Sequence, residues 1–185
     1  MSLISQSDLE ARLGRTLTSE EVTSFTIINS ATQRMVEEMI GSSVEQQNAT
    51  TRYYDGGLQH LRIDPCTDIS EVKYTDDYSA VFYTLLTSDY TNEPINKTLK
   101  TMIRHRSGKF MTGINNITVT AKFSIYGDSG ILNIVKSAML DSIVAEMQNA
   151  NNVKKESIEG YSVEYVTPES KNAFSTIRLL FPEVI

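Results

Sequence analysis

The chain has 185 residues, of which 40% are hydrophobic and 22% charged, and its formal net charge is −6. This length corresponds to about one domain, and it is sufficient to bury a core without disulfide bonds. The excess of acidic residues argues against a broad surface that binds nucleic-acid phosphates. One cysteine and two histidines leave no disulfide framework and few metal ligands, so we expect no cofactor.

Neither a membrane span nor a secretory signal is expected. No apolar run approaches the ~18 residues that a transmembrane helix needs. The N-terminal segment is polar, carries acidic residues and lacks the apolar core of a signal peptide. We therefore expect a globular protein that is made in the cytoplasm and has no membrane partner.

The N-terminal segment is predicted to form two helices. Ser7 with Glu10 is a capping-box pattern for a short helix, and Thr18 with Glu21 repeats the pattern for a longer one. A glycine follows each helix, as is typical of helix C-termini. The apolar residues of the longer helix are mostly three or four positions apart, which predicts one buried face. They are Val22, Phe25, Ile28, Met35, Val36, Met39 and Ile40.

Residues 50–126 are predicted to form a β-rich insertion. Thr50–Tyr54 is β-branched and aromatic, and the turn signal Asp55-Gly56-Gly57 follows it. An alternating run begins soon afterwards, and we expect Pro65 to stop it. The other strand candidates are Val72–Tyr74, Val81–Leu86 and Ile117–Tyr126, of which the last shows the clearest two-residue alternation.

Helix is predicted again after Gly127, up to the asparagine-rich stretch Asn149–Asn152. A short strand at Tyr161–Tyr165 and a last helix that Pro182 ends are expected to follow. This order predicts an α+β fold in a single domain, 1–185. Its expected parts are a small helical bundle of residues 1–49 and 127–150, the insertion at about 50–126, and an extended C-terminal arm with a helix at 151–185.

The sequence offers two weak candidates for a catalytic nucleophile. Gly127-Asp128-Ser129-Gly130 is similar to the nucleophile loop of serine proteases, but only His60 and His105 could act as its base. Asp128 or Ser129 is better explained as the cap of the following helix. Cys66 with His60 could form a thiol–imidazole pair, although a lone cysteine is usually a buried apolar residue. A hydrolase using Ser129 or Cys66 is therefore the alternative hypothesis, and we expect no enzyme.

Two further hypotheses concern the binding of a ligand. Arg104, His105, Arg106 and Lys109 form a basic cluster, which is better explained as a solvated turn than as a phosphate site. A pocket for a small ligand in the β-rich insertion would instead define a small soluble binding module. A ring-forming protein should self-associate, whereas a small binding module need not, so the oligomeric state separates the two hypotheses.

Two stretches of the chain resemble a known family. The first comprises Leu9–Gly14, Thr18–Glu21 and the helix end Glu37–Gly41. The second is Val153–Tyr165, with the sequence VKKESIEGYSVEY. Both are similar to the head–tail connector proteins of tailed bacteriophages, also called adaptor or head-completion proteins. Thr51–Gly56, at the start of the insertion, resembles the branch of this family that carries a β insertion.

The resemblance implies a structural virion protein in the neck between head and tail. Members form a ring under the portal, of about twelvefold symmetry to match it, in which helices of neighbouring subunits lie side by side. The ring extends the DNA channel and joins the portal to a stopper or tail-completion protein. Genome DNA passes through without sequence-specific binding, which suits an acidic protein.

The C-terminal segment is the expected interface with the portal or a neighbouring subunit. Apolar side chains on one side of the last helix would otherwise be exposed to water at a chain end. The alternative is that this helix completes the subunit's own bundle. The predicted interface residues are Tyr161, Phe174, Ile177, Arg178, Leu180 and Phe181.

Overall fold

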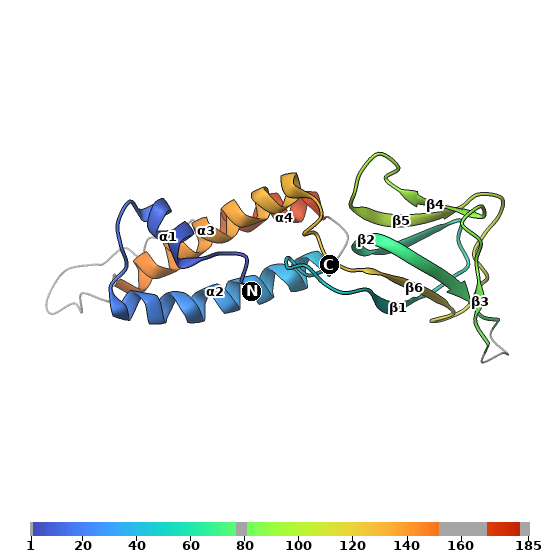
Figure 1. The fold of residues 1–185 in the computed structure, drawn as a ribbon, viewed down its shortest axis with the longest axis horizontal. Helices are drawn as coiled ribbons and strands as arrows, with labels where there is room; N and C mark the ends of the chain where they lie inside the picture. Colours follow the sequence, from blue (N-terminus) through green and yellow to red (C-terminus); the bar gives the residue numbers. More distant parts are fainter. Residues whose placement is uncertain (1, 77–80, 152–169, 182–185) are drawn as a thin grey trace, which may run out of the picture. The chain divides into compact units, whose positions relative to one another are not determined.

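The computed structural model describes residues 2–76, 81–151 and 170–181. Among these residues it has four helices and a six-stranded antiparallel sheet, which confirms the α+β class (Figure 1). The chain divides into two compact units. We call Met1–Met39 with Asn133–Ile185 the helical unit, and Ile40–Leu132 the sheet unit. The strand expected at Tyr161–Tyr165 lies outside the described residues.

The described helices are α1 (Gln6–Leu13), α2 (Ser19–Ile40), α3 (Ser129–Asn151) and α4 (Ser170–Leu180). All four were expected from the sequence, because each combines a local stop or start signal with an apolar repeat of three and four residues. The side chains buried in the helical unit come from every one of these helices. They include Leu9, Phe25, Val36, Val135, Met139, Ile143 and Ile177.

The cap of α1 differs from the prediction. Ser5, not Ser7, is the N-cap: its hydroxyl accepts a hydrogen bond from the Asp8 amide at 3.2 Å, and the Asp8 carboxylate accepts one from the Ser5 amide at 2.9 Å. The same box chemistry therefore occurs two residues earlier. Glu10 is not free for a box, because its carboxylate accepts hydrogen bonds from the Gln6 side chain and the Leu17 amide.

The start and end of α2 agree with the prediction, but its buried face includes polar residues. Met35, expected in the core, is exposed, whereas Asn29 is buried. Asn29 can be buried because its side-chain amide donates to the Ser2 hydroxyl and the Ile4 carbonyl, both at 2.9 Å. The Gln33 side chain accepts from Ser2 and from the Leu3 amide. Polar side chains of α2 therefore bind the segment that precedes α1.

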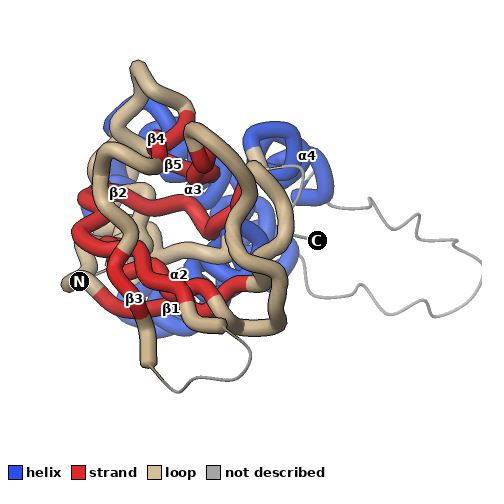
Figure 2. Tube along the Cα trace, turned by 90° about the vertical axis from the view of Figure 1, so that its right-hand side faces the viewer, coloured by secondary structure: helices blue, strands red, loops and turns tan. Residues whose placement is uncertain are grey.

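The strands are β1 (Thr50–Tyr54), β2 (His60–Tyr74), β3 (Tyr83–Thr84), β4 (Tyr90–Glu93), β5 (Lys100–His105) and β6 (Ile117–Lys122). Their order in the sheet is β1-β6-β2-β5-β4, and β3 pairs with the end of β2 (Figures 1 and 2). The turn signal after β1 does not make a hairpin with β2, because β1 pairs with β6.

Strand β2 continues through Pro65, where the sequence predicted a stop. Its first part pairs with β5 as far as Cys66, and from Thr67 onward it pairs with β6. The register of the β5 pairing shifts between Arg62 and Cys66, so Pro65 lies in an irregular stretch of the ladder. A proline is tolerated there because no ladder hydrogen bond requires its missing N–H.

Strand β6 is shorter than its alternation predicts, because Ser124 pairs with a different segment. Ser124 makes a parallel bridge with Ser43: the Ser43 amide donates to the Phe123 carbonyl, and the Ile125 amide donates to the Ser43 carbonyl. The residues that follow α2 therefore belong to the sheet unit. Its core contains Leu61, Ile63, Cys66, Val72, Leu85, Tyr90, Ile103, Phe110, Ile117, Val119, Ala121 and Phe123.

Arg52 on β1 holds this bridged region to the sheet. Its guanidinium donates to the Gly41 carbonyl and pairs with the Asp64 carboxylate, each at 2.7 Å. It also lies 4.2 Å from the centre of the Phe123 ring, within the range of a cation–π contact. The Tyr54 hydroxyl donates to the same carboxylate at 2.8 Å. One arginine thus joins the residue after α2, two strands and the residue after β6.

Candidate functional site

Helix α4 carries four of the six predicted interface residues, and Phe181 follows it directly. Ile177 is fully buried and Phe181, just beyond the helix, is nearly so. Phe174 is half-buried, whereas Arg178 and Leu180 are exposed. The side chains expected on a single side therefore separate into two sets.

Burial of Ile177 and Phe181 matches the alternative in which α4 completes the subunit's own packing. In this conformation of the chain neither side chain is accessible to a partner. Leu179, which the prediction omitted, is 81% exposed and lies next to Arg178 and Leu180. Tyr161, the sixth predicted residue, lies outside the described residues.

An exposed apolar row runs along α2. Ile27 is 69% exposed and Met35 42%, and the exposed Ala31 lies between them. Residues four positions apart lie on one side of a helix, so these three side chains form a stripe. The spacing was visible in the sequence, but the longer apolar series on the other side of the helix obscured it. We call Ile27, Ala31 and Met35 the α2 stripe.

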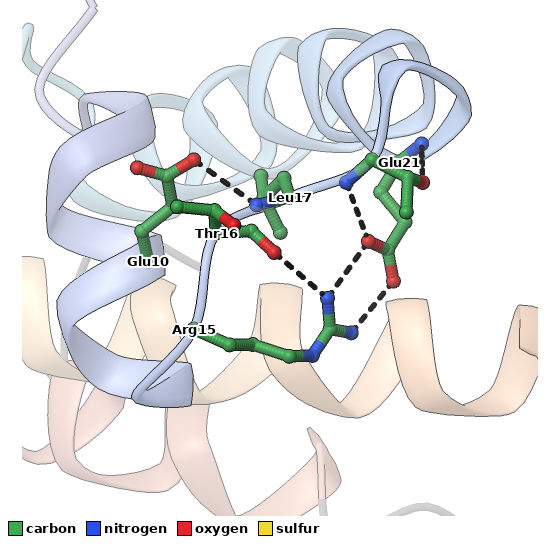
Figure 3. A network of polar contacts seen from close by, with 6 residues as sticks. Glu10, Arg15, Thr16, Leu17 and Glu21 are labelled. Atoms are coloured by element: carbon green, nitrogen blue, oxygen red, sulfur yellow. Dashed lines mark hydrogen bonds and ion pairs between the residues drawn. The ribbon is translucent and has the colours of Figure 1, made fainter.

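The corner between α1 and α2 is held by a polar network (Figure 3). The Arg15 guanidinium donates to both carboxylate oxygens of Glu21, at 2.9 and 2.7 Å, and to the Thr16 carbonyl. Glu21 also closes the expected capping box, because it accepts from the Thr18 amide at 2.9 Å. The hydrogen bonds from Arg15 and Thr18 lower the pKa of Glu21 to about 2.

Two ion pairs connect α1 with α3. Lys136 donates to the Asp8 carboxylate at 2.8 Å, and Arg12 pairs with Asp141. Burial raises the pKa of Asp8, but hydrogen bonds from Lys136 and Ser5 outweigh this effect and bring the pKa to about 2. The ionised carboxylate is therefore the form that stabilises this contact.

We expect acid to remove part of the stability of the helical unit. The pKa of Asp8 is lower in the folded chain than its ordinary value of 3.8, so its contribution is complete above about pH 4 and is lost as the pH falls toward 2. Asp8→Asn should reduce the free energy of unfolding at pH 7 by about 1 kcal/mol, allowing for solvent screening. The difference from the wild type should vanish near pH 2 in denaturation curves; a constant difference across this range would contradict the assignment.

The serine-protease-like segment is a helix cap. The Asp128 carboxylate accepts hydrogen bonds from the Gly130 and Ile131 amides, both at 3.1 Å, at the start of α3. Ser129 is exposed in the first turn, and neither His60 nor His105 hydrogen-bonds to it. The sequence admitted either residue as the cap, and the structure selects Asp128.

Asp128→Ala should therefore cost about 0.5–2 kcal/mol of unfolding free energy, because two amides of α3 lose their acceptor. Ser129→Ala should stay within about 0.5 kcal/mol of the wild type. Urea unfolding of both variants provides the comparison. An equal loss in the two variants would show that the serine also caps the helix.

Cys66 does not have the surroundings of a nucleophile. It is fully buried, and this burial, with the nearby Asp64 carboxylate, raises the pKa of the thiol to about 12. His60 is exposed, and it lies six positions before Cys66 on the same strand, or roughly 20 Å away in extended chain. The structure therefore does not bring the proposed thiol–imidazole pair together.

The basic cluster is partly used inside the sheet. The Arg106 guanidinium donates to the Tyr90 carbonyl and the Thr91 hydroxyl, so it binds β4. The His105 ring stands edge-on to Phe110, with 5.5 Å between ring centres. Arg104 lies 3.9 Å from Glu93. Arg104 and His105 belong to β5 and Arg106 binds β4, so this part of the cluster is not the solvated turn that the sequence predicted.

The sheet unit has a cavity of about 300 Å³. Its lining is mostly apolar and includes the Asp55 and Arg62 side chains, but both already have partners: Asp55 accepts from the Asn115 amide, and Arg62 interacts elsewhere. Across the described ranges no three His, Cys, Asp or Glu side chains form a possible metal site. None of the described helices is long and apolar enough to cross a membrane.

No protein-family model matches the chain, and a search of the curated proteins gives no match to it. Function must therefore be inferred from the residues and their arrangement. Among the described residues, the exposed large apolar side chains include those of the α2 stripe and the end of α4, and the sheet unit exposes others such as Leu58, Ile95 and Ile114.

Proposed function

We propose that this protein is a structural component of a tailed-phage virion, which forms a ring under the portal and connects the head to the tail. The observation that carries the proposal is the apolar surface of the helical unit. The α2 stripe, Ile134 on α3 and Leu179 on α4 stay exposed although the unit has its own buried core. Exposed apolar groups of this kind are typical of protein contact sites.

The order of the elements supports the same function. A helix pair, a β insertion, a third helix and a terminal helix follow one another as in the family that the sequence resembles. We interpret the helical unit as a small bundle, and most of the arm expected at 151–185 lies outside the described residues apart from α4. The residues of the resemblance at Leu9–Gly14 and Thr18–Glu21 coincide with the networked corner of α1 and α2.

The net charge of the chain is compatible with a channel through which DNA passes without being bound. A net charge of −6 repels phosphates, so the genome can move through a ring of such subunits without binding to it. In this proposal the partners are the portal, a stopper or tail-completion protein, and further copies of the chain. The protein has no catalytic role, and its place is the virion neck.

The test is the number of copies in a complex with the portal, measured by mass photometry. Many copies per portal, consistent with a closed ring, are expected, because one heterologous contact repeats until the ring closes. One or two copies per portal would contradict the proposal.

The cavity in the sheet unit favours a second function, a small binding module. Its size is at the lower limit of ordinary ligand pockets. A module of this kind needs no self-association, so a chain that binds a small molecule in the cavity and adds no ring to the portal would replace the first proposal.

A further inference from the structure

We infer that the exposed end of α4 in one copy of the chain binds the α2 stripe of the next copy. This inference rests on the proposed ring, and it identifies the two surfaces that build it. The exposed end of α4 consists of Arg178, Leu179 and Leu180. Residues Ile177 and Phe181, which are buried, anchor the helix so that these three side chains face water.

Both surfaces have the composition of an interface core. Among the large apolar side chains described in the helical unit, Leu179 is the most exposed at 81%, and Ile27 is the most exposed of α2 at 69%. Apolar side chains on a helix lose little backbone freedom on binding, because the helix is already ordered. Their burial therefore contributes to affinity. The ion pair of Arg34 with Glu38 lies beside Met35 and would form part of a polar rim.

The charges of the two helices select the partner. Helix α2 has four glutamates and one arginine, a formal charge of −3 that the pairing of Glu21 with Arg15 reduces to about −2, whereas α4 has one lysine and one arginine, a charge of +2. Opposite charges favour α4 on α2, and they disfavour both α2 on α2 and α4 on α4. A symmetric dimer through either helix is therefore the weaker solution.

Two different surfaces on one chain make a heterologous contact. Figure 1 shows α2 and α4 as separate helices of the helical unit, with α4 beside α3, so the two surfaces belong to different elements. In Figure 2 the end-on view likewise separates α4 from α2. A contact of this kind leaves one free surface at each end of a dimer, so it adds copies until a ring closes.

The test uses two single variants of the full chain and their mixture. Ile27→Asp disables the α2 stripe, and Leu179→Asp disables the end of α4. Each alone should weaken self-association at least about tenfold in sedimentation velocity, because a charge enters an apolar contact. Mixed together, they should form a one-to-one dimer and nothing larger, since only one intact pair of surfaces remains.

Matched controls separate this effect from a general loss of exposed apolar area. Ile95→Asp and Leu86→Asp change side chains of the sheet unit that are 68% and 66% exposed. Both should self-associate like the wild type. All four variants should melt like the wild type, because none of the replaced side chains is buried.

Four outcomes would overturn the inference. The first two are a wild-type chain that stays monomeric up to roughly 1 mM and single variants that self-associate like the wild type. The other two are a mixture of the variants that forms no dimer and a Leu179→Asp chain that loses portal binding but still self-associates. The copy number on the portal is read separately. If many copies bind the portal but the two variants form no dimer when mixed, the proposed function stands and the inferred contact is wrong. If the mixed variants form a dimer but no ring binds the portal, the inferred contact stands and the proposed function is wrong.

Discussion

Ile177→Ala is expected to lower the free energy of unfolding by about 2–5 kcal/mol. The side chain is 0% exposed, so its truncation removes buried methyl and methylene groups and leaves a cavity. Leu179→Ala, two residues further on, should change the stability by less than about 0.5 kcal/mol because Leu179 is exposed. Chemical denaturation followed by circular dichroism measures both.

The Ile177→Ala and Leu179→Ala variants also test whether α4 packs within its own subunit or docks on a partner. If Ile177→Ala melts like the wild type, α4 does not pack in the free subunit, and all its apolar side chains are available for docking. A chain cut after Thr167 gives a second readout: the loss of Ile177 and Phe181 should lower its melting temperature strongly. A cut chain that melts normally and still joins the portal ring would contradict both roles of α4.

The helices could be predicted because their signals are local. Thr18 and Glu21 form the expected box, and Gly14 and Gly41 adopt left-handed backbone angles, with φ of 69° and 72°, where each helix ends. Such signals lie within a few residues of the structure they determine. The error at Ser7 amounts to two residues: Ser5 and Asp8 form the capping box that the sequence predicted for Ser7 and Glu10.

The strand boundaries depended on partners that are distant in the sequence. Pro65 would end an isolated strand, but β2 changes from one neighbouring strand to another near that residue, and the ladder there tolerates a proline. Likewise β1 pairs with β6, more than sixty residues away, and not with the strand that follows its turn. Local patterns carry no information about such pairings.

The candidate site was predicted as a segment but not as a surface. The apolar side of α4 is visible in the sequence, yet spacing alone cannot tell whether Ile177 faces the core and Leu180 faces water. On α2 the same limit placed Met35 in the core and overlooked Ile27. Buried polar residues are equally hard to foresee, because Asn29 and Asn116 satisfy backbone groups of remote segments.

Asn116 provides the second large expected effect. It is buried, and its side-chain oxygen accepts from the Gly56 amide at 2.9 Å, while its nitrogen donates to the Met111 carbonyl at 2.8 Å and the Thr75 carbonyl at 3.4 Å. One side chain thus joins three loops of the sheet unit. Asn116→Ala should cost about 2–4 kcal/mol of unfolding free energy, because these buried groups lose their partners.

Asn116→Asp should be worse at neutral pH and should depend on pH. One oxygen of the buried carboxylate would still accept from the Gly56 amide, but the other would face the Met111 and Thr75 carbonyl oxygens without a donor, so the pKa of this carboxyl in the folded variant rises above the unfolded value. The extra cost is absent below the unfolded pKa of about 4 and grows as the pH rises toward neutrality. Asn96→Asp, at an exposed position of the same unit, should be close to the wild type throughout. Urea unfolding at pH 4 and pH 7 measures the difference; an Asn116→Asp chain as stable as the wild type at pH 7 would show that the side chain does not hold these loops together.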